Sequence, residues 1–281
     1  MKKEFSAEDI RALEPAEKVG LLATISPEGQ PHITLITSLQ ALDGDHLAFG
    51  EFSWGLSKWY VRNNPKTAFV MMTLDRSLWR GKALWTHYLR EGREYEMYNK
   101  KPMFRYNTYF GINTVHYLDV VEFGGREKLP LGAIIGSTLA TQAARGGAAV
   151  KRTERILPPL AESFFNVMGS MKFIAYVDAD GFPVLVPALQ CQAADSGRLV
   201  FSAGAYGKDL LKIPAGSEVA VFGCTMQMEN ILVRGTFAGF RRYRGVKMGT
   251  VDIDWAYNSM PPVHGQIYPE LPLEPVVRFQ G

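Results

Sequence analysis

The stretch QALDGDHLAFG at residues 40–50 returns 152 residues later as QAADSGRLVFS at residues 192–202. The same offset, without a gap, aligns further turn and strand residues: Ala23 with Ala175, Gly29 with Gly181, and Pro31 with Pro183. Self-similarity at one fixed offset is the sequence signature of a structural repeat. We therefore expect a tandem duplication of one domain.

Two further matches require a change of offset. After a small shift, Arg80-Gly81 aligns with Arg234-Gly235. After a second shift, Tyr98-Asn99 aligns with Tyr257-Asn258. If these matches are structural, each pair occupies the same position in its half.

Each half begins with a short helix and continues as apolar runs separated by tight turns. The first runs, 21–25 and 173–177, are followed by turns that end in Gly29 and Gly181. Glycine in a two- or three-residue connection between apolar runs is a hairpin signal. Many short strands with few helices favour small barrels. The predicted fold is mainly β (α+β), with copy 1 at 1–123, a linker at 124–157 and copy 2 at 158–281.

Composition limits the classes of protein that fit. A length of 281 residues suits two domains, and a net charge of +3 gives no reason to expect a nucleic-acid partner. No apolar segment follows the N-terminal lysines, and no run is long enough to span a membrane. Cys191 and Cys224 are expected to be buried reduced thiols, which together with these absences suggests a cytoplasmic protein. The histidines and cysteines show no zinc-binding spacing, so no metal site is expected.

The order of these features resembles the FMN-binding split β-barrels, the family of pyridoxamine 5'-phosphate oxidase, flavoredoxin and small FMN-binding proteins. In the first half the resemblance rests on residues 43–50, 53–58 and 61–68, and in the second on 181–187, 202–208 and 218–220. The second half departs from the pattern, with Pro214 in its helical region and Ser217 where the first half has Pro65. The resemblance therefore leaves open whether one or both pockets are intact.

FMN requires donors for its phosphate and an apolar wall for its ring. Before the expected helix of the first half, Ser53, Ser57 and Lys58 are phosphate donors, and Lys208 is the candidate of the second half. The resemblance implies that Arg80 and Arg234 also reach the phosphate. It further places Thr34, Thr37 and Pro187 on the strands that run along the ring. Trp54 and Tyr206 are aromatic candidates for the apolar wall.

The leading hypothesis is an FMN-dependent oxidoreductase acting on a small substrate or an electron partner. A non-catalytic flavin-binding electron carrier is the alternative, and a deazaflavin could replace FMN. A haem-binding relative is a third possibility, in which His32, His87 or His116 would ligate iron. The two barrels could form the flavin groove within one chain, as a pseudo-dimer, or the chain could form a homodimer.

Overall fold

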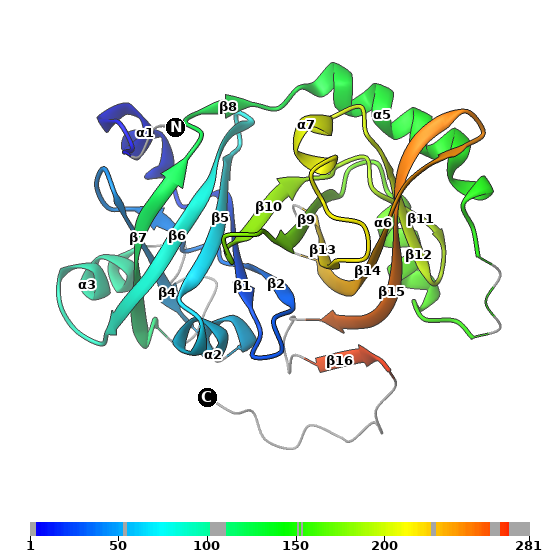
Figure 1. The fold of residues 1–281 in the computed structure, drawn as a ribbon. Coiled ribbons are helices and arrows are strands. Elements are labelled where there is room, and N and C mark those ends of the chain that lie inside the picture. Colours follow the sequence, from blue (N-terminus) through cyan, green and yellow to red (C-terminus); the bar gives the residue numbers. More distant parts are fainter. Residues whose placement is uncertain are drawn as a thin grey trace.

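A computed structural model describes residues 4–52, 55–101, 111–150, 152, 154–225, 229–258 and 265–269. It contains two antiparallel sheets of eight strands each (Figure 1). The main path of the first sheet is β2-β1-β5-β6-β7-β4-β3, and that of the second is β10-β9-β13-β14-β15-β12-β11. These paths have the same topology, strand for strand. The chain is a tandem pair of split β-barrels.

Among the described residues, the first barrel contains strands β1 to β8 and the short helices α1, α2 and α3. Its elements in chain order are α1 (Ala7–Leu13), β1 (Lys18–Ile25), β2 (Pro31–Leu35), β3 (Gln40–Ala41), β4 (His46–Glu51), α2 (Leu56–Asn63), β5 (Lys66–Thr73), β6 (Ser77–Leu89), α3 (Arg93–Lys100), β7 (Thr114–Phe123) and β8 (Glu127–Lys128).

A helical connection, α5 (Leu131–Ala144) and η1 (Arg145–Gly147), leads to the second barrel. The elements of the second barrel are α6 (Pro159–Asn166), β9 (Met171–Val177), β10 (Pro183–Pro187), β11 (Gln192–Asp195), β12 (Arg198–Ser202), α7 (Gly207–Leu210), β13 (Glu218–Cys224), β14 (Asn230–Tyr243), β15 (Val246–Asn258) and β16 (Gly265–Tyr268). The division of the chain at residues 123 and 158 remains a prediction.

The turns and core positions that revealed the repeat are equivalent in three dimensions. Gly29 and Gly181 both have positive φ, +84° and +77°, in the β1–β2 and β9–β10 turns. Only glycine adopts this conformation without strain. Phe49 and Phe201 are fully buried, each in the core of its own barrel. The prediction of two β units of like topology is confirmed.

The strand register corrects the match between Arg80 and Arg234. Ala68 pairs with Lys82 on β6, and its counterpart Ala220 pairs with Arg234 on β14. Lys82 therefore occupies the ladder position of Arg234, and the offset of 152 continues without a shift. Arg80 lies two residues earlier on β6, where the second barrel has Leu232.

The match between Tyr98-Asn99 and Tyr257-Asn258 is also wrong. The first pair lies in helix α3 and the second at the end of strand β15. The reason is an insertion in the first half. A tight turn through Arg244 and Gly245, both with positive φ, connects β14 directly to β15, whereas the first barrel carries α3 between β6 and β7.

The two barrels pack against each other through one shared hydrophobic core. Strand β2 lies against β13 and β14 of the second barrel, and β10 lies against β5 and β6 of the first. The shared core includes Leu21, Val70 and Leu78 from the first barrel and Phe173, Phe222 and Leu232 from the second. The contacts are thus reciprocal, and the chain forms a pseudo-dimer within itself.

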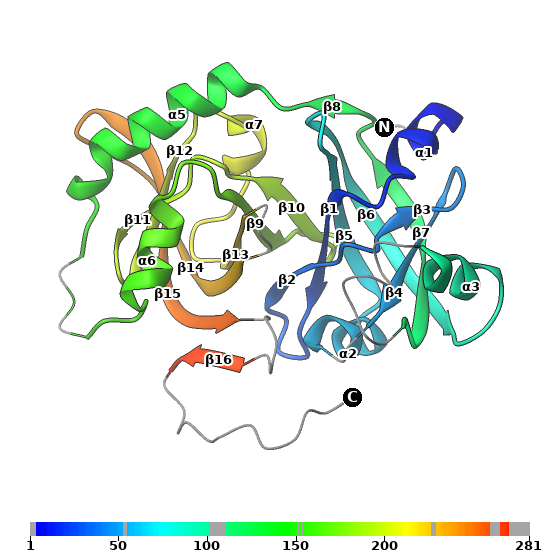
Figure 2. The same cartoon turned by 180° about the vertical axis from the view of Figure 1, so that it is seen from behind.

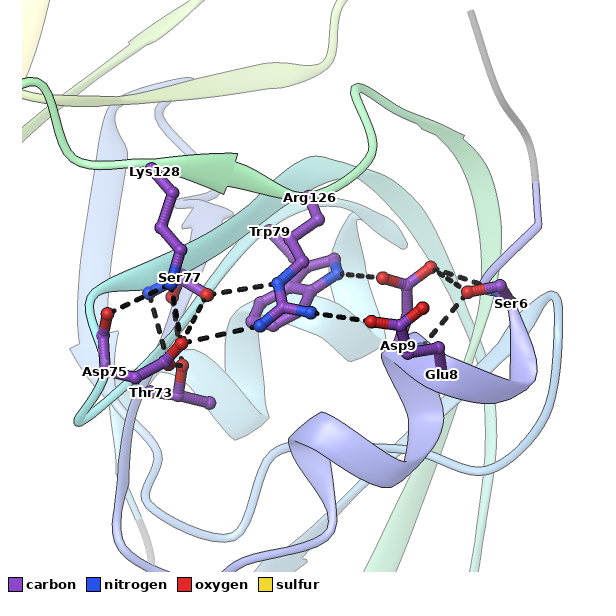
Figure 3. Close-up of polar contacts among 9 residues, drawn as sticks. All are labelled: Ser6, Glu8, Asp9, Thr73, Asp75, Ser77, Trp79, Arg126 and Lys128. Carbon is purple, nitrogen blue, oxygen red and sulfur yellow. Dashed lines mark hydrogen bonds and ion pairs between the residues drawn. The ribbon is translucent and has the colours of Figure 1, made fainter.

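Helix α1 and the start of the linker are fastened to the first barrel by a polar network (Figure 3). Ser6 caps α1 and forms a capping box with Asp9. Trp79 Nε1 donates to Asp9 Oδ1 at 2.9 Å, and the Arg126 guanidinium lies 5.4 Å from the Trp79 ring centroid while bonding to Glu8. Trp79 is a fully buried core residue of the first barrel.

Helix α5 covers one side of the second barrel (Figure 2). The Ser137 hydroxyl accepts the backbone N–H of Ala205 at 2.7 Å, and the Thr141 hydroxyl accepts that of Ser202 at 3.0 Å. Linker residues are thus bonded to the end of β12 and to the loop that follows it. Among the helices of the described residues, α5 included, none is long and apolar enough to cross a membrane. Cys191 and Cys224 are buried free thiols.

Candidate functional site

A buried arginine lies where β14 of the second barrel meets the first barrel. Arg234 is 7% exposed, and its guanidinium carbon lies 3.8 Å from the centroid of the Trp255 ring. It donates a hydrogen bond to Gln30 in the turn before β2. Its Nε is buried and has no hydrogen-bond partner among the described residues. Burial lowers the pKa of Arg234, while the nearby Tyr60 hydroxyl, Asp254 and Glu28 act in the opposite direction.

Aromatic rings from both barrels contact one another beside this guanidinium. His32 on β2 meets Tyr60 on α2 edge-on, with centroids 5.3 Å apart, and meets Tyr257 on β15 at 5.7 Å. Tyr257 stacks on Trp255 at 5.3 Å, with an interplanar angle of 9°. We call these five residues the Arg234 cluster: Arg234, His32, Tyr60, Trp255 and Tyr257. Of these, the sequence had indicated only Arg234 as a flavin ligand.

The start of α2 lies one helical turn before Tyr60 and carries two predicted phosphate donors. Its N-cap is Gly55, which makes no side-chain cap, so the expectation that Ser57 and Lys58 precede the helix is wrong. The Ser57 hydroxyl is buried and has no hydrogen-bond partner among the described residues. Lys58 Nζ would lie 3.5 Å from a Cβ added to Gly55, so the ammonium folds back over the helix start. Ser53 and Trp54 lie outside the described residues.

A buried histidine–carboxylate pair adjoins Lys58. His116 Nε2 lies 2.8 Å from Glu51 Oε2, and Trp85 Nε1 donates to His116 Nδ1 at 3.1 Å. Because Nδ1 accepts the hydrogen bond from Trp85, Nε2 must carry the hydrogen that it donates to Glu51. Burial lowers the pKa of His116, and the Glu51 hydrogen bond opposes that effect without reversing it. Burial also lowers the pKa of Lys58, and the Glu51 charge opposes it.

This arrangement bears on the haem alternative. Both ring nitrogens of His116 are engaged by protein groups, so iron ligation would break one of these bonds. His87 is exposed and stacks on Tyr117 with centroids 4.5 Å apart. His32 belongs to the Arg234 cluster and is 2% exposed.

The equivalent position on the other side of the molecule is occupied by ion pairs. Lys82 Nζ lies 2.6 Å from Asp180, 3.6 Å from Asp178 and 3.8 Å from Glu122. Lys66 Nζ also reaches across and donates to the backbone carbonyl of Asp180 at 2.7 Å. We call these residues the Lys82 cluster: Lys66, Lys82, Glu122, Asp178 and Asp180.

Arg80 lies beside the Lys82 cluster and also contacts the second barrel. Its guanidinium pairs with Asp209 at 2.7 Å and with Glu127 at 3.0 Å, and lies 5.5 Å from the centroid of Tyr206. Arg80, Tyr206 and the exposed Lys208 line one open pocket of about 540 Å³. Three of the predicted ligands are thus brought together, but two carboxylates already neutralise Arg80.

The remaining predicted residues lie on the two strands at the barrel interface. Thr34 is half-buried on β2 opposite Leu22, and Thr37 follows the same strand. Pro187 ends β10, where it is buried opposite Phe173. The predicted ligands thus fall into two groups. One lies at α2 and the Arg234 cluster and contains Ser57, Lys58 and Arg234. The other lies on the opposite side and contains Arg80, Tyr206 and Lys208.

No protein-family model and no curated protein matches the chain. Among the solved structures similar to it is HupZ of Group A Streptococcus, with 18% identity, 42% of this chain and 91% of that chain covered, and a TM-score of 0.36. A putative pyridoxamine 5'-phosphate oxidase from Lactobacillus delbrueckii shows 20% identity, 44% and 99% coverage, and a TM-score of 0.35. An FMN-binding protein from Syntrophomonas wolfei shows 17% identity, with 43% of this chain and 86% of that chain covered and a TM-score of 0.35. At these values, the function must be inferred from the residues of this chain.

Proposed function

We propose that the chain binds FMN between the start of α2 and the Arg234 cluster and is an FMN-dependent oxidoreductase. The observation that carries this proposal is the buried guanidinium of Arg234, whose Nε has no partner among the described residues. An unsatisfied buried donor costs about 1–3 kcal/mol, more when it is charged. A bound ligand with an acceptor at this point would remove that cost.

The residues present suit the two ends of FMN. The start of α2 presents backbone N–H groups without a side-chain cap, the unpartnered Ser57 hydroxyl and the Lys58 ammonium. Helix N-termini of this kind bind phosphate. One turn later, Tyr60 leads to the aromatic rings and to Arg234, which suit the apolar faces and the polar edge of an isoalloxazine.

The bound flavin would supply hydride or electron transfer, and the protein would bind, orient and shield it. Ser57 and Lys58 would hold the phosphate, and Arg234 would donate to an oxygen or nitrogen at the ring edge. The buried rings of His32, Tyr60 and Tyr257 would exclude water from one side. The Glu51–His116 pair would fix the position of Lys58 from the opposite side of α2.

The first experiment is the visible spectrum of the purified protein, followed by mass identification of the released ligand. Flavin absorption bands and the mass of FMN would support the proposal. A Soret band would favour the haem alternative, the mass of a deazaflavin would change the cofactor, and no chromophore after reconstitution with FMN would refute flavin binding. Anaerobic reduction followed by substrate-dependent reoxidation would separate an oxidoreductase from an electron carrier.

The phosphate contacts are tested with Lys58→Met, and Lys100→Met serves as the matched control. Lys100 forms an exposed pair with Glu96 on α3, away from α2. Loss of a charge-assisted bond at Lys58 should weaken FMN binding by about 10- to 150-fold, as 1.5–3 kcal/mol implies. Equal FMN affinities of the two variants would remove Lys58 from the site.

A further inference from the structure

We propose that the Lys82 cluster is an ion-pair clasp that stands where a second flavin site would be. The chain then binds a single flavin, and the clasp holds the two barrels together whether or not flavin is bound. The single-flavin part of this inference rests on the proposed function, whereas the clasp does not.

Two basic residues occupy the same ladder position in the two barrels. Lys82 on β6 and Arg234 on β14 each project from their own barrel toward the β-turn of the other. Arg234 meets the neutral side chain of Gln30 there and keeps an unpartnered Nε. Lys82 pairs with three carboxylates, those of Asp180, Asp178 and Glu122. At the offset of 152 residues, Asp180 is the counterpart of Glu28. Among the described residues Arg234 has no carboxylate at ion-pair distance, although Glu28 and Asp254 act on it from farther away, whereas three carboxylates pair with Lys82.

The helix start also differs between the halves. At the offset of 152 residues, the position of Ser57 is taken by Asp209. The Asp209 carboxylate bonds to Arg80 across the interface at 2.7 Å. A hydroxyl can donate to a phosphate, but an ionised carboxylate is acceptor-only and repels it.

The backbone donors of the second loop are engaged as well. Ser137 of α5 accepts the N–H of Ala205, and its hydroxyl would lie 2.3 Å from a Cβ added to Gly204. Helix α7 has only four residues and offers little of the dipole that binds phosphate. Helix α5 therefore engages the Ala205 N–H of this loop and lines the open pocket beside it.

The charges of this side are already paired within the protein. Around the Lys82 cluster and Arg80, five described carboxylates stand against five basic side chains: Glu122, Glu127, Asp178, Asp180 and Asp209 against Lys66, Arg80, Lys82, Lys208 and Lys212. FMN carries close to two negative charges on its phosphate. A surface without an excess of positive charge has little to attract FMN but suits reciprocal ion pairing between barrels.

The clasp is tested by thermal melting of the flavin-free full chain. Lys82→Met should lower the Tm by about 2–4 °C, a shift expected for loss of one good interaction in a protein of this size. The difference from wild type should shrink in 1 M salt, which screens ion pairs. Lys100→Met, which removes a lysine pair within one helix, should leave the Tm nearly unchanged.

Asp180→Asn provides a second variant if Lys82→Met does not fold. In the double variant, the two Tm shifts should be less than additive, because both remove the same pair. Additive shifts, or wild-type melting of Lys82→Met, would overturn the clasp.

Flavin stoichiometry tests the other half of the inference. Native mass spectrometry of FMN-reconstituted wild type should show one FMN per chain, and Lys82→Met should retain it. Two FMN per chain, or loss of FMN from Lys82→Met, would refute the single site. Complete absence of FMN binding would instead refute the proposed function, while the melting experiment would still decide the clasp.

Discussion

Arg234→Met separates ligand binding from folding. The substitution should weaken FMN binding while it leaves the stability of the flavin-free protein nearly unchanged. Methionine fills a similar volume and removes the charge, the stacking on Trp255 and the bond to Gln30. In the flavin-free protein, the lost cation–π contact costs about 0.5–2 kcal/mol, and the lost charge-assisted bond to Gln30 costs about 1.5–3 kcal/mol. Removal of a buried donor without a partner returns about 1–3 kcal/mol, more because it is charged. These effects largely offset one another, so the Tm of the flavin-free variant should lie within a few degrees of wild type.

In the flavin-bound protein nothing offsets the loss. Removing a charge-assisted bond should raise the Kd for FMN by about 10- to 150-fold, measured by quenching of flavin fluorescence. Lys82→Met is the matched control, because it changes the same ladder position on the other side and should leave the Kd unchanged. If Arg234→Met lowered the Tm by more than ten degrees and bound FMN normally, Arg234 would be a structural residue and the proposed site would be wrong.

Two further predictions concern stability. Phe49 is fully buried and stacks on His116 at 4.6 Å, so Phe49→Ala should destabilise the protein by about 3–5 kcal/mol, which urea unfolding would measure; a loss below 1 kcal/mol would contradict this. Burial acts to raise the pKa of Asp180, but hydrogen bonds from Lys82 and the Phe182 backbone outweigh it and leave that pKa lowered. The clasp should thus contribute to stability at neutral pH, and this contribution should be lost as the pH falls below about 4, toward the lowered pKa of Asp180. The Tm difference between wild type and Lys82→Met should vanish at that acidic pH.

The fold could be predicted from the sequence because its signals are local. A glycine with positive φ, an aspartate before a hairpin and an alternating apolar run each specify a few neighbouring residues. When such signals recur at one offset, as at Gly29 and Gly181, they report the same turn in two domains. The wrong matches arose where the sequence offered only short identities. A dipeptide such as Arg80-Gly81 can recur by chance, and the ladder that contradicts it is set by hydrogen bonds to other strands.

The candidate site depends on contacts that no local pattern reports. His32 and Tyr60 come from the first barrel and Trp255 and Tyr257 from the second, and their meeting depends on how the barrels dock. The spacing of Trp255 and Tyr257 was the one available signal, since alternate residues of a strand face the same side. It could have indicated an aromatic face, but not which arginine that face would meet.

The duplication within one chain explains how the two sides could come to differ. In a homodimer of a single barrel, any substitution appears at both symmetric sites, so a change that strengthens docking at one also removes the ligand contacts at the other. In a fused chain the halves mutate separately. Lysine and three carboxylates can then favour docking on one side, while an arginine with an open Nε is kept on the other. It follows that residues at matched positions along the interface should differ most where the ligand binds. Two such differences, Ser57 where the second half has Asp209 and Arg234 where the first half has Lys82, mark the side to be tested for FMN.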